Sequence, residues 1–315
     1  IAIDLGGTKC AGAIVNESGE VLTKVKDELA GKKGKEVGTL IRTQVNHLKS
    51  YCIDHGLDIT GIGVSVPGIS NKNSGKVWAP NIPGWQEYGL TEELESAFGN
   101  TNILVDVDSD RACTILGEVW KGSARECKNA IFLAIGTGIG AGILIDGQVL
   151  QGSQGIAGAI GWWALDGPYR SEYAQFGDFE YHASGDGIIR VARNYCDEIK
   201  SDLINHETID QLSAREIFDF YKQKDPVAVK TIDQAIMYWG KTIANLVSLF
   251  NPEKIIFGGG VFGPGTQFLD NIYMEALKWA QPIAINQVQL IGAKLGNDAA
   301  LLGACKLILD QTKLK

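Results

Sequence analysis

The sequence predicts an α/β protein with two similar domains, and three observations lead to this prediction. The chain has 315 residues, of which 45% are hydrophobic, and this length exceeds that of a typical single domain. Short apolar runs of strand length alternate with longer segments of helical periodicity. A strand, a glycine-rich turn and a second strand open the chain at 1–26 and occur again at 130–150. The repetition indicates a duplicated α/β unit.

The first half predicts strands before residue 6, at 11–15 and at 21–25, with turn residues at 16–19. Apolar positions at helical spacing then predict a helix at 36–51. A strand at 59–66 ends at Pro67-Gly68. The remaining elements expected in this half are a helix at 90–98, a strand at 102–107 and a helix at 111–120.

The second half repeats this order, with strands at 130–135, 143–145 and 149–150 around a glycine turn at 136–142. Helices are expected at 187–195, 214–222, 226–250 and 298–309, and strands at 254–257 and 288–291. The predicted domains are residues 1–113, completed by the C-terminal helix within 298–315, and residues 114–297.

Composition and charge exclude several classes of protein. The net charge of −8 is not that of a general nucleic-acid binder. The six scattered cysteines contain no Cys-x-x-Cys pair and are expected to be reduced core residues of a cytoplasmic protein. No signal peptide is visible, and glycines interrupt the apolar run at 130–145, so no membrane span is predicted.

Glycine is unusually frequent, with 39 residues, and three glycine-rich turns each follow an apolar strand. Such turns allow consecutive backbone N–H groups to converge on an anion. A single turn of this kind is as well explained by a tight hairpin, but three favour a cradle for nucleotide phosphates. The turns are Asp4-Leu5-Gly6-Gly7-Thr8-Lys9, Gly136-Thr137-Gly138-Ile139-Gly140 and Gly258-Gly259-Gly260.

Acidic residues cluster at Asp106, Asp108 and Asp110, at the end of a predicted strand. Alternation along a strand predicts that all three face one side, where they would meet a cation, a substrate hydroxyl or water. Asp110 also stands where a residue would cap the helix at 111–120, and the two roles are compatible.

Together these segments resemble the ROK family, which includes bacterial glucokinases and related sugar kinases with the actin-like ATPase fold. The resemblance spans nearly the whole chain. Besides the glycine turns, it rests on Pro67-Gly68, Ala79-Pro80-Asn81-Ile82-Pro83-Gly84-Trp85, Leu116-Gly117-Glu118-Val119-Trp120-Lys121-Gly122, Gly158-Ala159-Ile160-Gly161 and Ser184-Gly185. It implies two ribonuclease-H-like domains with MgATP in the cleft between them, and phosphoryl transfer to a sugar hydroxyl.

The resemblance also implies roles for individual residues. Asp110 matches the catalytic aspartate, which acts as a general base. The residues implied to bind ATP or its phosphates are Asp4, Gly6, Gly7, Thr8, Lys9, Gly136, Thr137, Gly138, Gly258, Gly259 and Gly260, with Asp4 orienting Mg²⁺ through water. The residues implied to face the sugar are Gly68, Asn81, Ser109, Asp110, Trp162 and Glu180.

This chain departs from the family pattern around the sugar. Most members have Asn-Asp where Ser109-Asp110 stands, and Gly-Glu-x-Gly-His where Gly158-Ala159-Ile160-Gly161-Trp162 stands. The missing histidine also binds zinc in typical members, and the accompanying cysteine-rich loop is absent. We therefore expect no zinc, a loop at 166–176 held by aromatic packing, and an acceptor that is a modified, amino or substituted hexose. Trp162 and Trp163 either stack on that acceptor or fill the volume left by zinc.

The leading hypothesis is an ATP-dependent sugar kinase that phosphorylates the 6-OH, in a cytoplasmic homodimer. The alternative is a catalytically weak or inactive protein that binds or senses sugar. A DNA-binding repressor is not expected, because the first phosphate turn begins at residue 4. The sequence leaves open whether polyphosphate can replace ATP.

Overall fold

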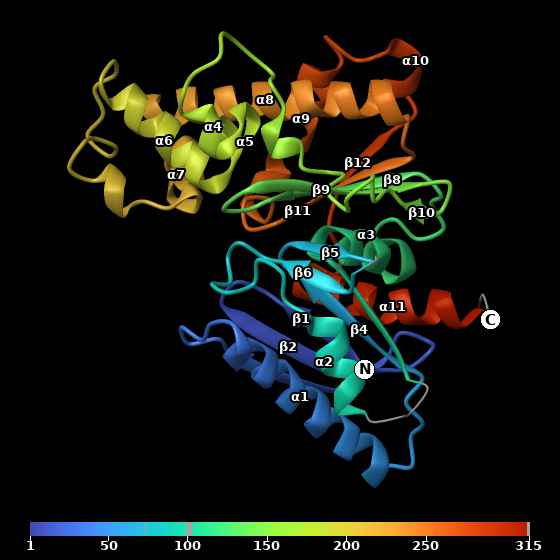
Figure 1. The fold of residues 1–315 in the computed structure, drawn as a ribbon. Helices are drawn as coiled ribbons and strands as arrows, with labels where there is room; N and C mark the ends of the chain where they lie inside the picture. Colours follow the sequence, from blue (N-terminus) through green and yellow to red (C-terminus); the bar gives the residue numbers. More distant parts are fainter. Residues whose placement is uncertain (73, 99–102, 314–315) are drawn as a thin grey trace. The chain divides into compact units, whose positions relative to one another are not determined.

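A computed structural model describes residues 1–72, 74–98 and 103–313 (Figure 1). The chain divides into two compact units. Unit 1 comprises Ile1–Glu126, Val149–Ala157 and the chain from Lys294, and unit 2 comprises Cys127–Gln148 and Gly158–Ala293. Each unit is described below by itself.

Unit 1 contains a five-stranded sheet with the order β3-β2-β1-β4-β7. The strands β1, β2 and β3 pair antiparallel, whereas β4 and β7 run parallel to β1. Their bounds are β1 Ala2–Leu5, β2 Lys9–Val15, β3 Val21–Glu28, β4 Gly61–Val66 and β7 Leu104–Ser109. Part of the predicted strand at 102–107 lies outside the described residues. A small hairpin of β5 (Ile69–Asn71) and β6 (Lys76–Trp78) was not predicted.

Helices cover both faces of this sheet because the strands carry apolar residues on both sides. Figure 1 shows α1 (Lys35–Asp54) and α2 (Leu90–Ala97) on one face and α11 (Ala299–Lys313) on the other, where α3 (Asp110–Lys121) packs against α11. Ile3 and Leu5 are buried with α1, whereas the preceding residue, Ala2, is buried with α11.

The helices α3 and α11 pack backbone against backbone. A Cβ at Gly117 would collide with the carbonyl of Ala299, and a Cβ at Gly303 would collide with the carbonyl of Cys113. The boundary predicted at 113 therefore falls inside α3. The observed division comes after Glu126, because α3 is one rigid helix held against α11.

Unit 2 contains a second five-stranded sheet, with the order β10-β9-β8-β11-β12. The sheet consists of β8 Ala130–Ile135, β9 Ile139–Ile145, β10 Gln148–Val149, β11 Lys254–Gly258 and β12 Gln289–Gly292. The strands β9, β8, β11 and β12 pair antiparallel, parallel and parallel, as β2, β1, β4 and β7 do in unit 1. This agreement confirms the duplicated α/β unit expected from the sequence.

The glycine turn predicted at 136–142 is shorter than expected. It spans only the residues between β8 and β9, and Gly140 and Gly142 are strand residues that pair with Ala134 and Phe132. A glycine inside a strand leaves the ladder of backbone hydrogen bonds intact. The glycine content of this segment therefore made the predicted turn too long.

Seven α-helices of unit 2 lie within the described residues, and the predictions at 214–222 and 226–250 match α7 and α8 to the residue. Their bounds are α4 Tyr173–Phe176, α5 Asp178–Ala183, α6 Gly185–Cys196, α7 Ala214–Lys222, α8 Pro226–Phe250, α9 Leu269–Ala276 and α10 Pro282–Ile285. Helices α4, α5, α9 and α10 are too short to show a periodicity in the sequence.

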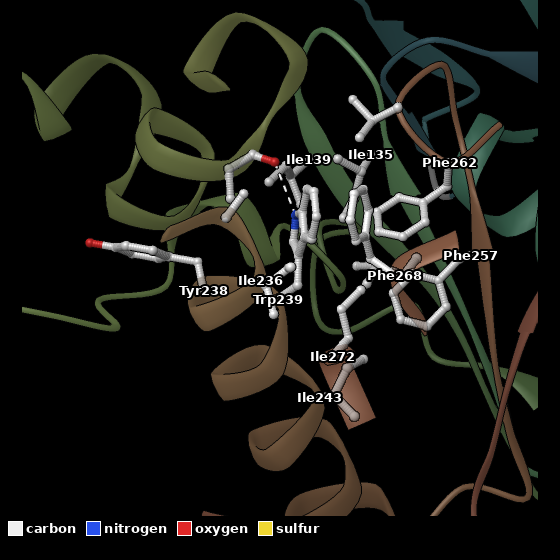
Figure 2. Packing of buried hydrophobic residues seen from close by; sticks show 14 of the residues in the cluster. Ile135, Ile139, Ile236, Tyr238, Trp239, Ile243, Phe257, Phe262, Phe268 and Ile272 are labelled. Carbon is white, nitrogen blue, oxygen red and sulfur yellow. Dashed lines mark hydrogen bonds between the residues drawn. The ribbon is translucent and has the colours of Figure 1, made fainter. Parts of the chain in front are cut away.

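The core of unit 2 lies between α8 and the sheet and is centred on Trp239. Figure 2 shows the Trp239 ring among aromatic and aliphatic side chains that include Phe257, Phe262 and Ile272. The indole Nε1 donates a hydrogen bond to the carbonyl of Ala183 at 3.1 Å, so this buried polar atom has a partner. The bond fixes the end of α5 against α8.

Within the described residues, no helix combines the length and the apolar character that a membrane crossing needs. All six cysteines are free, and all but Cys196 are buried.

The fully buried carboxylate of Glu118 joins two connections of unit 1. It accepts hydrogen bonds from the backbone N–H groups of Ser123 (2.7 Å), Lys294 (3.1 Å) and Leu295 (3.0 Å). These groups lie just before the chain leaves unit 1 for unit 2 and just after it returns. Glu118 therefore anchors both connections.

We expect Glu118→Gln to lower the free energy of unfolding by about 2 kcal/mol, because one amide N–H₂ would face backbone donors in a buried site. Urea denaturation measures this change. Glu95→Gln on the exposed face of α2 is the control and should change it by less than about 0.5 kcal/mol. Equal effects of the two substitutions would contradict the anchoring role.

Candidate active site

The first glycine turn of unit 1 connects β1 to β2 and presents open space. The N–H of Gly6 donates to the carbonyl of Lys9 at 2.8 Å, and the N–H of Leu29 donates to the carbonyl of Thr8 at 2.7 Å. A Cβ at Gly7 would meet nothing within 4 Å. The turn is therefore fixed by its own hydrogen bonds while one side of its backbone stays accessible to a ligand.

Two carboxylates of unit 1 influence each other beside this turn. Asp4 lies near the end of β1, and Asp110 is the first residue of α3. Burial raises the pKa of Asp4 to about 6, and the negative charge of Asp110 adds to this rise. Burial also raises the pKa of Asp110, against the opposing charge of Arg111. A raised pKa brings a carboxylate closer to the pH at which a general base is effective.

The residue that caps α3 is Ser109, not Asp110 as one interpretation of the sequence suggested. The Ser109 hydroxyl accepts a hydrogen bond from the N–H of Ala112 at 3.2 Å. The Asp110 carboxylate accepts a hydrogen bond through Oδ1 from the N–H of Arg111 at 2.8 Å. Because Ser109 performs the capping, the second carboxylate oxygen of Asp110 is not used by the helix.

Asp110 does not share a strand face with Asp106 and Asp108, contrary to the prediction. Only the latter two lie on β7, and both face the ammonium group of Lys72, at 2.6 Å and 3.1 Å. This cation was missed, because a single lysine in a hairpin loop has no sequence signal. Asp108 also accepts from Gln151 at 2.8 Å, and Gln311 donates to Asp106.

The two loops implied to face the sugar lie in unit 1. Gly68 follows β4, and a Cβ there would collide with the carbonyl of Trp78, so close packing requires this glycine. Asn81 is exposed in a loop closed by the hydrogen bond from the N–H of Ala79 to the carbonyl of Trp85, at 2.7 Å. Trp85 is fully buried and stacks on Tyr88, which holds the loop in place.

Unit 2 brings its glycine turns together. The N–H of Gly185 donates to the carbonyl of Gly136 at 2.7 Å, and a Cβ at Gly136 would lie 3.8 Å from the nitrogen of Gly260. Thr137 is exposed at the tip of its turn. Gly258 packs against the ring of Phe132. Three segments far apart in the sequence thus form one surface of closely spaced backbone.

Two glycines of the last turn serve different purposes. Gly259 has a φ of +87°, and a Cβ there would collide with the carbonyl of Ile135, so the fold itself requires glycine. A Cβ at Gly260 meets nothing within 4 Å. The fold therefore leaves room for a side chain at position 260. A ligand that approaches the backbone closely there would require that the side chain be absent.

This difference gives a prediction for three alanine variants. Gly7→Ala and Gly260→Ala should raise the KM for ATP about tenfold and leave the melting temperature within about 2 °C, because their Cβ atoms point into open space. Gly259→Ala should lower the free energy of unfolding by about 2 kcal/mol, because of its positive φ. Steady-state kinetics and thermal denaturation measure both effects. A KM unchanged in both open-space variants would contradict phosphate binding by these turns.

Glu180 lies on α5 and connects the first glycine turn of unit 2 to the segment before Trp162. Its Oε2 accepts a hydrogen bond from the N–H of Ile139 at 2.7 Å. Cβ atoms at Gly138 and Gly161 would lie 2.8 and 2.9 Å from the same oxygen. Burial raises the pKa of Glu180. The other carboxylate oxygen, Oε1, has no hydrogen bond within the described residues.

Aromatic side chains hold the loop at 166–176, as expected. Tyr173 contacts the rings of Tyr169 and Tyr181 edge to face, with centroids 6.4 and 5.3 Å apart. His182 lies beneath it, and its two ring nitrogens contact the Tyr173 hydroxyl and the Gln234 amide, each at 2.9 Å. Both ring nitrogens of His182 are therefore engaged by side chains of unit 2.

The two tryptophans at 162 and 163 differ in environment. Trp162 ends a short 3₁₀ turn and is 58% exposed. Trp163 is partly buried against the core of unit 2. The described residues contain no group of three or more His, Cys, Asp or Glu side chains placed to hold a metal ion. The expectation of no zinc remains a prediction.

Comparison with known proteins agrees with the fold described above. The ROK family model matches residues 1–311. A glucokinase of Halalkalibacterium halodurans is 32% identical, with 99% of this chain and 95% of that protein covered. A β-glucoside kinase of Listeria monocytogenes is 26% identical, with 98% and 97% covered. A xylose repressor of Caldicellulosiruptor bescii is 30% identical, with 80% and 63% covered.

Two solved structures show the same fold. A ROK hexokinase from Thermus thermophilus is 28% identical, covers 100% of this chain and 99% of its own, and has a TM-score of 0.80. A ROK glucokinase from Streptomyces griseus, solved with glucose and AMPPNP, is 27% identical over 97% of both chains, with a TM-score of 0.74. They confirm the predicted fold class, two ribonuclease-H-like domains of the actin-like ATPase superfold. Because the family model matches almost the entire chain, this protein belongs to the ROK family.

Proposed function

We propose that this protein transfers the γ-phosphoryl group of ATP to a hydroxyl of a hexose or of a modified or amino hexose, with the 6-OH as the acceptor. Its membership of the ROK family and its match to glucokinases over nearly the whole chain make it an ATP-dependent sugar kinase. The observation that carries the proposal is Asp110, held at the start of α3 with a raised pKa and an oxygen free of the helix.

In the proposed reaction the Asp110 carboxylate takes the proton of the attacking sugar hydroxyl. The hydroxyl oxygen forms a bond to the γ-phosphorus, the bond from that phosphorus to the β–γ bridging oxygen breaks, and ADP leaves with the electron pair. Catalysis of this transfer rests mainly on positioning and on neutralising charge. The raised pKa of Asp110 suits the acceptance of one proton near neutral pH.

The backbone of both units supplies the phosphate-binding groups in this proposal. In unit 1 these are Gly6, Gly7, Thr8 and Lys9, with Lys9 adding a positive charge. In unit 2 they are Gly136, Thr137, Gly138, Gly258, Gly259 and Gly260. The open space beside Gly7 and Gly260 supports a ligand that approaches the backbone closely.

Magnesium fits the carboxylate pair of unit 1. The negative charges of Asp4 and Asp110 act on each other, so the two carboxylates together attract a cation. Oxygen donors of this kind suit Mg²⁺. Asp4 would orient the ion through water. When bound, Mg²⁺ neutralises charge on the phosphates of ATP.

We propose that Gly68, Asn81, Ser109, Trp162 and Glu180 contact the sugar, together with Asp110. Support comes from the exposed amide of Asn81 and from the oxygen Oε1 of Glu180, which is free to accept a sugar hydroxyl. The Ser109 hydroxyl accepts from Ala112 and retains its own proton for donation. We further propose that the protein is a cytoplasmic homodimer.

A sugar-sensing protein without catalysis is the second candidate. It is favoured by the xylose repressor among the relatives and by Ala159 and Trp162, which stand where most members have glutamate and histidine. Regulators need to bind sugar but have no use for a base with a raised pKa. The retention of Asp110 therefore favours the kinase.

The proposal is tested by measuring ADP release over a panel of hexoses, amino sugars and glycosides, each with ATP and with polyphosphate. We expect ATP-dependent turnover with at least one sugar at neutral pH. Sugar binding without turnover over the whole panel would instead support the sensing protein. Calorimetric titration with AMPPNP, run in parallel, separates a failure to bind nucleotide from a wrong choice of sugar.

A further inference from the structure

Lys72 lies between β5 and β6 and contacts the end of β7. Its ammonium group lies 2.6 Å from the Asp106 carboxylate and 3.1 Å from the Asp108 carboxylate. It also donates a hydrogen bond to the carbonyl of Val107 at 2.8 Å. One side chain thus contacts three consecutive residues of β7, just before α3 begins.

The two carboxylates that Lys72 contacts are buried, whereas its own side chain is 43% exposed. Burial would lower the pKa of Lys72, but the charges of Asp108 and Asp106 raise it above its ordinary value, so Lys72 is protonated at neutral pH. The side chains of Gln151 and Gln311 also contact these carboxylates, but they are neutral amides. Loss of the Lys72 charge would therefore leave two like charges close together in a buried place.

Asp108 connects Lys72 to the peptide that precedes the candidate base. Its Oδ2 faces Lys72 and accepts a hydrogen bond from Gln151 at 2.8 Å, while its Oδ1 accepts from the N–H of Ser109 at 2.7 Å. The Ser109 hydroxyl caps α3, and Asp110 is the first residue of that helix. The orientation of the Asp108 carboxylate therefore influences how the chain passes from β7 into Asp110.

β7 is also an edge strand, because it is the last strand of the sheet of unit 1 and pairs there with β4. An edge strand has backbone groups that no neighbouring strand binds, and it is held less firmly than a central strand. Lys72 binds β7 through a backbone carbonyl as well as through two side chains. It therefore holds the strand end that carries the candidate base into place.

We propose that Lys72 is a positioning residue for phosphoryl transfer, which holds Asp110 through Asp108 and the backbone of β7. The inference rests on the proposed function, because it takes Asp110 as the general base. In this role Lys72 needs no contact with the sugar or with ATP, and it transfers no proton. Positioning of this kind matters because a displacement of about 1 Å at a catalytic group can lower the rate by about 10²-fold.

The test measures the steady-state kinetics of Lys72→Met and Lys72→Arg with the sugar that the wild type phosphorylates best. We expect Lys72→Met to lower kcat about tenfold and to change the KM for ATP by less than about twofold, because it displaces the base and not the phosphate-binding turns. Lys72→Arg retains the charge and should keep kcat within about threefold of the wild type. If Lys72→Met does not fold, Lys72→Gln, which retains two donors, takes its place.

Lys76→Met, in the same hairpin, is the matched control. Lys76 pairs with the exposed Glu87 at 2.9 Å, and the loss of an exposed ion pair should leave kcat unchanged. Thermal denaturation shows the temperature at which every variant is fully folded, and kcat is measured there. A role in stability alone would lower the melting temperature of Lys72→Met but leave its kcat at the wild-type level, which would overturn the inference and leave the kinase proposal standing.

A double-mutant cycle shows whether the effect of Lys72 passes through Asp110. In the Asp110→Asn background, Lys72→Met should lower the residual kcat by less than about twofold, because no base remains to be positioned. A loss of about tenfold in both backgrounds would show that Lys72 acts on another group, and the inference would be wrong.

Hydrogen exchange of the ligand-free protein tests the same contact without turnover. Lys72→Met should speed exchange at the N–H groups of Ser109 and Arg111 at least about threefold, whereas Lys76→Met should not. If the wild type phosphorylates no sugar, the proposed function fails. In that case unchanged exchange in Lys72→Met overturns the anchoring by Lys72 as well, and faster exchange confirms it.

Discussion

Asp110→Asn is expected to lower kcat by about 10³-fold, which is the scale of a lost general base. The amide has nearly the shape of the carboxylate, and its oxygen can still accept the N–H of Arg111 at the start of α3. The KM for ATP and for the sugar should therefore change by less than about threefold. Steady-state ADP release with the best sugar of the panel measures both constants.

The pH dependence gives a second test of the same residue. Burial raises the pKa of Asp110, so the acid limb of kcat/KM should lie above the ordinary pKa of an aspartate, about 4. Because Asp4 and Asp110 interact, the limb belongs to the pair. Removing the charge of Asp110 should lower the pKa of Asp4 from its value of about 6.

Asp270→Asn, in the exposed first turn of α9, is the control for these measurements. It should leave kcat within about twofold of the wild type. Turnover that persists at the wild-type level in Asp110→Asn would show that another group accepts the proton.

Asp4→Asn is expected to abolish most turnover and at the same time to stabilise the free protein. Loss of the carboxylate that orients Mg²⁺ should lower kcat/KM for ATP by about 10²-fold. The free energy of unfolding should rise by about 2 kcal/mol at neutral pH, because a buried charge is removed. Kinetics and urea denaturation of the ligand-free protein measure the two effects separately.

The sign of the stability change follows from the pKa of Asp4. The folded chain raises this pKa from 3.8 to about 6, so the folded state binds the proton more tightly than the unfolded state. Ionisation of Asp4 therefore costs stability, and the cost grows as the pH rises from about 4 to about 6. The difference between variant and wild type should be present at pH 7 and absent near pH 3.5.

Asp58→Asn, an exposed substitution outside the candidate site, is the matched control and should change stability at neither pH. A loss of stability in Asp4→Asn at pH 7 would contradict the destabilising effect of the buried, ionised Asp4 carboxylate. An unchanged KM for ATP would contradict its role with the metal.

Much of the fold could be predicted because it depends on local pattern. The helix at 226–250 carries apolar residues at helical spacing throughout and begins with a proline, and its bounds were predicted to the residue. The strand–turn–strand repeats predicted a duplicated unit, and both sheets have the same strand order. The short helix that carries Glu180 was not predicted, because six residues show no periodicity.

The candidate site could be predicted only as a set of separate motifs. The glycine turns were found from their residue types and spacing, whereas the role of Asp110 was implied by the resemblance to the ROK family. The sequence did not predict which residues contact them. Lys72 pairs with Asp106 and Asp108 across more than thirty positions. The idea of three aspartates on one face was wrong because β7 ends at Ser109 and Asp110 begins α3.

The sequence by itself determined the alternation of strands and helices through local periodicity, and the resemblance of its motifs to the ROK family implied the fold class and the candidate residues for phosphate binding and for the base. Only the tertiary structure decided which glycines are needed by the fold and which leave room for a ligand, and how burial raises the pKa of Asp4 and Asp110. The physical reason is that free volume, desolvation and side-chain contacts arise between segments distant in sequence, and no single segment encodes them alone.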